Sequence, residues 1–241
     1  VQVKTFHAWF SQLMRMAPLD VLAQMGLQPG MALMEDVDEL RLELFRRFQN
    51  RVAAEPALRA DYMALVVRQG RHTLMRWLDA AWSKRVEIER ADAAACLDNA
   101  IPSAASRYAD CAGLAHPLAL LASAHFVEAA DTAARELGAS ASKTSQKVAE
   151  GLRAALTLIA RGALSDGFDQ AIAALHTDKG TPRKLPGEPA CAAALSGELL
   201  AIDERVKQQD AHDDQRRMCA LSRVLLAEFA ALKRARAVVD M

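Results

Sequence analysis

The sequence predicts an all-α fold, a multi-helix bundle with a short β element at its N-terminus. Hydrophobic residues make up 52% of the 241 residues but aromatic residues only 5%. Ala and Leu therefore supply most of the apolar side chains, which favours closely packed helices. Apolar residues also recur at helical spacing along nearly the whole chain. Residues 1–4 are different, because V-Q-V-K alternates apolar and polar side chains as a strand does.

The first helix is expected to follow Thr5, whose hydroxyl can cap its N-terminus, and to end at Pro18. A turn is expected over residues 28–34. Asp36 and Glu39 have the spacing of a capping box, which predicts that a second helix begins there. The apolar stripe of this second helix is Val37, Leu40, Leu44, Phe48 and Val52.

Two further helices are predicted before residue 91. Pro56 suits the first turn of one helix, which is expected to run to Gly70. The next helix has an inward face of Leu74, Trp77, Leu78, Ala81 and Trp82. The helix that begins near Asp36 has an outer face that can be a DNA-facing ridge or a surface of salt bridges. Its charge pattern favours salt bridges. That face carries Arg41, Arg46, Arg47 and Arg51.

Residues 138–146, with the sequence G-A-S-A-S-K-T-S-Q, have the composition of a linker. They would divide a single domain of residues 1–241 into lobes 1–137 and 147–241. Ala-rich helices interrupted by Pro102 and Pro117 are expected just before this linker. The segments expected after it are helices over 147–161 and 168–175, a loop over 177–189, and one or two long helices from about 191 to 237.

The formal net charge is zero, so no global field attracts polyanions, and a nucleic-acid surface must be a local patch. Residues 143–187 are the most basic segment, with seven Lys and Arg against four Asp and Glu. The four Cys lie far apart without a C-x-x-C pair, which is typical of reduced thiols in a cytoplasmic protein. No apolar run approaches the ~20 residues that span a bilayer, so no membrane partner is expected.

Motifs for catalysis or cofactor binding are missing from these 241 residues. There is no G-K-[ST] phosphate loop, no G-x-S-x-G and no His or Cys pair at metal-binding spacing. Residues 199–204 superficially resemble the apolar strand and acidic pair that hold Mg²⁺, but their helical period indicates a solvated helix face. We therefore expect no catalytic residue, metal or cofactor within this chain.

One loop has features of a phosphate-binding segment. Residues 179–184, K-G-T-P-R-K, combine a turn and exposed backbone N–H groups with the cations Lys179, Arg183 and Lys184. Such a loop can hold a phosphate backbone without reading bases. The alternative is an ordinary solvated turn. Lys233 lies in a second basic segment at the end of the last helix, where cations also interact favourably with the helix dipole.

Three segments, in this order, resemble motifs of the UvrD/Rep class of superfamily-one DNA helicases. Thr5-Phe6-His7 resembles the T-[FIL]-H motif, which contacts single-stranded DNA in that family. Residues 177–184 resemble the T-x-x-G-x-P-R-[KR] segment of AddA- and RecB-like helicase–nucleases. Residues 229–241 resemble the segment by which the chain re-enters the motor domain, with Met241 where Phe is usual.

The resemblance implies that the chain is the helical accessory subdomain inserted in the first RecA-like domain of such a helicase. Both ends look like cuts through a larger protein. The expected role is to guide DNA during break repair and recombination. Thr5, Phe6 and His7 would contact the single strand, and Arg183 and Lys184 the duplex backbone. Lys179 and Lys233 complete the expected DNA contacts.

The same resemblance implies ATP and Mg²⁺ as cofactors of the parent protein, which would be an ATP-dependent helicase. The fragment itself would have no enzymatic activity. The implied partners are single-stranded and duplex DNA, the remainder of the motor and a second nuclease subunit. A different class, a helical protein-interaction or adaptor module without a DNA role, explains the Ala- and Leu-rich helices and the neutral charge equally well.

Overall fold

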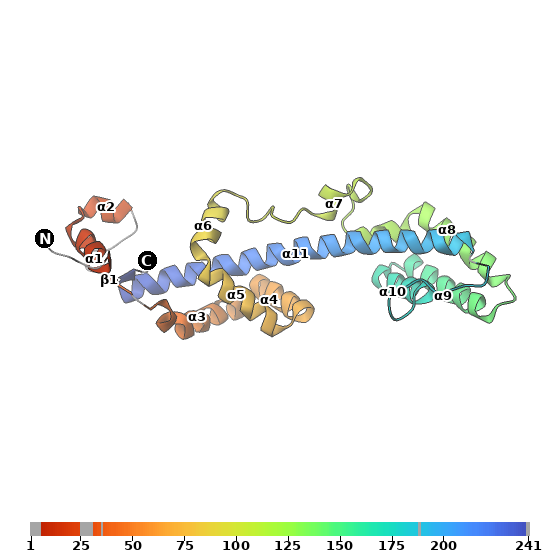
Figure 1. Cartoon of the computed structure of the whole chain (residues 1–241), viewed down its shortest axis with the longest axis horizontal. Coiled ribbons are helices and arrows are strands. Elements are labelled where there is room, and N and C mark those ends of the chain that lie inside the picture. Colours follow the sequence, from red (N-terminus) through yellow and green to blue (C-terminus); the bar gives the residue numbers. More distant parts are fainter. Residues whose placement is uncertain (1–5, 25–30, 35, 188, 240–241) are drawn as a thin grey trace. The chain divides into compact units, whose positions relative to one another are not determined.

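A computed structural model describes residues 6–24, 31–34, 36–187 and 189–239. The strand predicted at residues 1–4 and the cap predicted at Thr5 lie outside the described residues. The described part of the chain is mostly helical with one short two-stranded sheet (Figure 1), which confirms the all-α prediction. It forms two compact units. Unit 1 comprises Val1–Asp98 and Arg216–Met241, and unit 2 comprises Asn99–Gln215.

Unit 1 begins with helices α1 and α2 and ends with the last turns of the long helix α11. Strands β1 and β2 pair in parallel, with Ala32 opposite Val238 and Leu33 opposite Val239. Strand β1 lies where the sequence predicts a turn, and that part of the prediction is wrong. The elements of unit 1 are α1 (Phe6–Met16), α2 (Leu19–Gln24), β1 (Ala32–Leu33), the 3-10 turn η1 (Val37–Leu40), α3 (Arg41–Ala54), α4 (Pro56–Gln69), α5 (Arg71–Ser83), α6 (Arg85–Ala93), the C-terminal part of α11 (Ala190–Arg236) and β2 (Val238–Val239).

The core of unit 1 is formed by α3, α4 and α5 with the C-terminal part of α11. Asp36 caps η1, because its carboxylate accepts from the N–H of Asp38 at 2.9 Å. The chain then continues from η1 directly into α3. Phe45 packs edge-to-face on Trp82, with ring centroids 6.4 Å apart. Trp77, predicted to face inward, is half-buried. The predicted stripe is confirmed at Leu40 of η1 and at Leu44, Phe48 and Val52 of α3, which are all buried, while Val37 is half-buried.

Three of the four arginines on the outer face of α3, Arg41, Arg47 and Arg51, form salt bridges as the charge pattern predicts, whereas Arg46 is exposed and has none with a described residue. Arg41 binds Asp79 of α5, with Nη2 2.8 Å from Oδ2. Arg47 binds Glu43 one turn earlier on α3, with Nη2 2.7 Å from Oε1. Because these guanidinium groups are neutralised by neighbouring carboxylates, they do not form an open phosphate-binding ridge.

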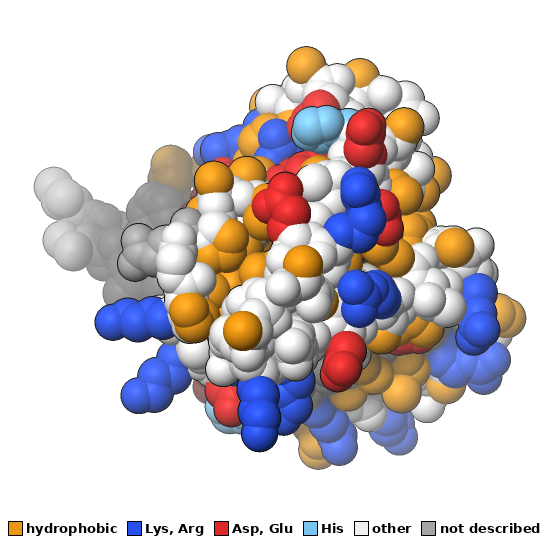
Figure 2. Space-filling view, turned by 90° about the vertical axis from the view of Figure 1, so that its right-hand side faces the viewer, with side chains coloured by type: hydrophobic (Ala, Val, Ile, Leu, Met, Phe, Trp, Pro, Cys, Tyr) orange, Lys and Arg blue, Asp and Glu red, His pale blue; other side chains and the backbone are white. Residues whose placement is uncertain are grey.

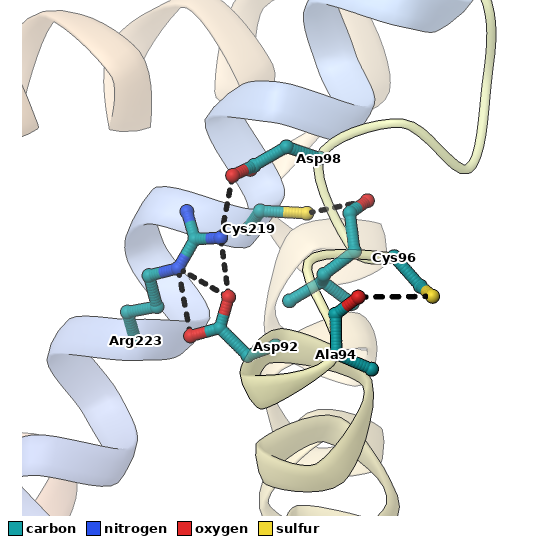
Figure 3. Close-up of polar contacts among 7 residues, drawn as sticks. Asp92, Ala94, Cys96, Asp98, Cys219 and Arg223 are labelled. Atoms are coloured by element: carbon teal, nitrogen blue, oxygen red, sulfur yellow. Dashed lines mark hydrogen bonds and ion pairs between the residues drawn. The ribbon is translucent and has the colours of Figure 1, made fainter.

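Arg223 of α11 fastens the end of α6 to the long helix (Figure 3). Its Nε lies 3.0 Å from both carboxylate oxygens of Asp92, and its Nη2 lies 2.7 Å from Oδ2 of Asp98. The hydrogen bonds that Arg223 donates lower the pKa of both carboxyl groups, and the same bonds, first to Asp92 and then to Asp98, raise the pKa of the guanidinium. This pairing therefore favours the folded state only while the carboxylates are ionised.

Arg223→Met is expected to lower stability at pH 7, and this loss should become smaller as the pH falls below the ordinary Asp value. A carboxyl group with a lowered pKa in the folded state stabilises that state above the ordinary Asp value of 3.8. This contribution is lost as the pH falls through the lower pKa of the folded state. Urea unfolding at pH 7, 5 and 3 measures the difference, with Arg59→Met as the control because Arg59 has no side-chain partner among the described residues. A difference that did not change with pH would contradict the prediction.

Unit 2 consists of short turns, three amphipathic helices and the N-terminal part of α11. Its core contains the fully buried or nearly buried Phe126, Leu152, Leu195 and Leu199. Residues 190–236 form one continuous helix. The elements before it are α7 (Ala104–Arg107), the 3-10 turns η2 (Ala109–Cys111) and η3 (Pro117–Ala122), α8 (Ala124–Gly138), α9 (Lys143–Ala160) and α10 (Leu164–Leu175).

The predicted linker at 138–146 joins two helices inside unit 2. Gly138 is the last residue of α8, and the hydroxyl of Ser142 caps α9 by accepting from the N–H of Ser145 at 3.4 Å. The chain divides instead after Asp98 and before Arg216. Gly and Ser are as typical of helix ends as of linkers, which explains why their composition predicts a linker where a loop joins two helices of one unit.

Candidate nucleic-acid interface

The basic loop that follows α10 folds as a tight hairpin over residues 176–183. The N–H of Thr177 donates to the carbonyl of Thr181, and the N–H of Gly180 donates to the carbonyl of Thr177, both at 2.8 Å. The two threonine hydroxyls are also 2.8 Å apart. Gly180 has a φ of +74°, a conformation that glycine adopts without strain. The spacing of Thr and Gly in this segment is thus explained by the turn, and the predicted turn is confirmed.

The hairpin exposes three predicted DNA-binding cations, Lys179, Arg183 and Lys184. Arg183 donates from Nη2 to the carbonyl of Ala173 at 3.0 Å, which holds its guanidinium near the end of α10. Neither Lys179 nor Lys184 has a side-chain hydrogen bond or ion pair with any described residue. Leu185 is buried directly after them and anchors the chain in the core. The ammonium groups are therefore exposed on an ordered turn.

The unpaired cations extend beyond the hairpin. Within the described residues, none of the seven Lys and Arg of segment 143–187 forms a salt bridge, whereas Arg135, Arg205 and Lys207 of the same unit do. On the face drawn in Figure 2, Lys and Arg side chains gather along the lower edge, and several Asp and Glu lie nearer the centre. The seven cations without a salt bridge to a described residue are Lys143, Lys147, Arg153, Arg161, Lys179, Arg183 and Lys184, of which Arg153 and Arg183 donate to backbone carbonyls.

Two hollows adjoin the hairpin, and Arg183 lines both. One lies between α9 and α10 and has a volume of about 290 Å³. Lys147 and Gln170 provide polar groups there. The other is lined mainly by apolar side chains, with Lys184 and Ser196 at its wall, and has a volume of about 250 Å³. The site thus has an open cationic turn flanked by two concave surfaces.

His176 supports the base of the hairpin and was not singled out by its sequence context. It is 2% exposed, and its Nε2 lies 2.9 Å from the hydroxyl of Ser196 on α11. Its Nδ1 has no hydrogen-bond partner among the described residues. The pairing joins the turn to α11. No local motif could have revealed it, because the two residues come from different elements.

The remaining predicted DNA contacts belong to unit 1. Thr5 lies outside the described residues, and Phe6 and His7 begin α1, but the structure does not describe their side chains. Lys233 is half-buried near the end of α11, where its Nζ lies 4.7 Å from the ring centroid of Phe229. The structure therefore brings three of the predicted contacts together in the hairpin and gives Lys233 a packing role on an aromatic ring.

The described residues offer little for metal or thiol chemistry. No group of three or more His, Cys, Asp or Glu there could hold a metal ion. Cys96 is an exposed free thiol, while Cys111 and Cys219 are buried. No helix in the described ranges is long and apolar enough to cross a membrane. Residues 199–204 lie within α11, so their interpretation as part of a helix is confirmed.

Comparisons with known proteins found no similar protein. No family model matches it, and neither the curated proteins nor the solved structures contain a match. Functional inference therefore depends on the hairpin, the surrounding charges and the motifs of the sequence.

Proposed function

We propose that this chain is a DNA-guiding helical subdomain of an ATP-dependent DNA helicase that acts in break repair and recombination. The observation that carries the proposal is the ordered hairpin with its exposed Lys179, Arg183 and Lys184, none of which has a carboxylate partner among the described residues. ATP and Mg²⁺ would be bound by the parent motor and not by this segment. The chain would contribute nonspecific contacts with duplex and single-stranded DNA.

The hairpin can hold a phosphate backbone through charge and through its main chain. Three cations against the single acid Asp178 make residues 177–184 locally positive. The backbone N–H of Lys179, at the tip, makes no hydrogen bond with a described residue. Such donors position a protein on a nucleic acid without reading its sequence, as a helicase that moves along arbitrary DNA requires.

Lys179→Ala/Lys184→Ala is expected to weaken binding to a fluorescent duplex with a single-stranded tail. Each lost phosphate contact removes about 0.9 from the slope of log affinity against log salt, so the slope should fall by about two. Fluorescence anisotropy measures the affinity and its salt slope. The titrations should cover about 50 to 200 mM salt, where such contacts dominate. Neither lysine side chain has a partner among the described residues, so the fold should be retained.

The matched control is Arg135→Ala/Lys207→Ala, which removes the same charge from the same unit. Arg135 is paired with Asp131, and Lys207 with Asp203. This variant should bind nearly as well as the unmodified chain. If the two double variants lose affinity equally, binding reflects net charge and not the hairpin. If the folded chain does not bind even at low salt, the proposal of independent DNA binding is wrong.

A helical protein-interaction module is the second candidate, and exposed apolar side chains on the first two helices favour it. Trp9 is 50% exposed, Met16 72% and Leu19 68%. Apolar side chains so exposed are typical of a surface that docks on protein. In the helicase proposal, that protein would be the remainder of the motor or a nuclease subunit. An adaptor without a DNA role would give no salt-dependent binding in the anisotropy experiment.

A further inference from the structure

We propose that the hollow between α9 and α10 is a binding site for a phosphate group. Thr144 and Lys147 come from the first turns of α9, Gln170 comes from α10, and Arg183 comes from the hairpin. Three separate elements therefore direct polar groups into one space of about 290 Å³. The inference goes beyond the proposed function, because it names another site and applies to a phosphate group from any source.

The lining of the hollow selects for an anion. None of the described carboxylates lines it, and a hydroxyl, an ammonium, an amide and a guanidinium all can donate hydrogen bonds. Thr144, Lys147 and Gln170 have no side-chain hydrogen bond or ion pair with any described residue. Arg183 is oriented by its bond to the carbonyl of Ala173 and keeps further N–H groups. The unused donors thus exceed the acceptors that line this space.

Phosphate fits this donor set better than a carboxylate does. A carboxylate has two oxygens in one plane, which suit the fork of a single arginine. Tetrahedral phosphate oxygens point in several directions and can accept from groups on different elements at once. Here the guanidinium of Arg183 is a directional donor, and the ammonium of Lys147 is a compact point charge on another helix. The first turns of α9 also add the positive end of a helix dipole.

Close packing of α9 on α10 gives the hollow its floor. A Cβ added at Gly151 would lie 2.8 Å from the Cβ of Ala174 and 3.8 Å from Nε2 of Gln170. Real Cβ atoms essentially never approach other heavy atoms within 3.0 Å. The absence of a side chain at Gly151 therefore lets α10 approach α9 and keeps the amide of Gln170 beside the first turns of α9.

The test is an NMR titration of the ¹⁵N-labelled chain with inorganic phosphate, with chloride at the same ionic strength as reference. Saturable shifts are expected in the first turns of α9 and in the side-chain amide of Gln170. Lys147→Met should weaken phosphate binding about tenfold, as loss of a charged hydrogen bond does. Arg161→Met is the control, because Arg161 also has no side-chain partner among the described residues but directly follows α9, about 20 Å from Lys147.

The source of the phosphate group is tested with two further probes. A nucleoside monophosphate carries a phosphate monoester, and a blunt DNA duplex without terminal phosphates carries only diesters. Shifts at the same residues with either probe support the site and identify the ester. If none of the three probes gives saturable shifts, the proposal is overturned. Equal weakening by Lys147→Met and Arg161→Met, or equally strong binding of acetate or an acidic peptide, would also overturn it.

The outcomes separate this inference from the proposed function. Lys147 and Gln170 are not part of the hairpin contacts tested with Lys179→Ala/Lys184→Ala. DNA binding that depends on the hairpin lysines, in a chain whose NMR signals near Lys147 respond to none of the three phosphate probes, would leave the proposed function intact and reject the phosphate site. Phosphate binding at Lys147 without DNA binding would support the phosphate site and reject the proposed function.

Discussion

Phe229→Ala is expected to lower the free energy of unfolding of unit 1 by about 3–5 kcal/mol, the range for removing a buried phenyl ring. Phe229 is 2% exposed, and its ring packs edge-to-face on Trp82 with centroids 5.8 Å apart. The guanidinium carbon of Arg85 lies 5.6 Å from the ring centroid, and the ammonium of Lys233 lies 4.7 Å from it. The substitution therefore removes an aromatic pair and two cation contacts together with the buried volume.

Hydrogen exchange of the whole chain measures this effect by region. Faster exchange is expected in α3, α4 and α5, which share a core with Phe229. Phe229→Leu is the matched control, because it keeps most of the volume and should lose less than about 1.5 kcal/mol. A Phe229→Ala variant as stable as the unmodified chain would contradict the prediction, and one only as destabilised as Phe229→Leu would show that the extra buried volume contributes little.

The helical parts of this fold could be predicted because their signals are local. Leu40, Leu44 and Phe48 are spaced one turn apart, and each is buried as that spacing predicts. Strand β1 has only two residues, and its partner Val238–Val239 lies at the other end of the chain. A strand of that length has no alternation to detect, so only its distant partner defines it. Unit 1 is built from two chain segments that are far apart in the sequence. This was also not predicted, because no local pattern relates the two segments.

The candidate site shows the same division between local and distant signals. The hairpin was predicted because Gly180 and Pro182 mark a turn within a few residues of its cations. The hollow was not predicted, because Lys147 and Gln170 belong to different helices and have no meaningful spacing in the sequence. Their relation follows only from the close approach of α9 and α10 at Gly151. Lys233 was assigned from a motif, whereas its contact with Phe229 depends on the packing of α11.

Phe126→Ala is expected to have an equally large effect in unit 2, about 3–5 kcal/mol, because Phe126 is 1% exposed in that core. The neighbouring core positions determine where in this range the value falls. Ala130, Ala133 and Ala149 are nearly or fully buried there, and alanine has no longer rotamers that could fill a hole. Most of the cavity should therefore remain, and the cost should lie near the upper end of the range.

The location of the Phe126→Ala effect is as informative as its size. Exchange should become faster in α8, α9 and α10, while α3 to α5 should keep most of their protection, because each unit has its own hydrophobic cluster. Phe126→Leu is the volume control. Equal acceleration in both units would show that they unfold together and would contradict the prediction of two separate cores. Since α9 and α10 form the phosphate hollow, Phe126→Ala should also weaken phosphate binding while the hollow's own side chains are unchanged.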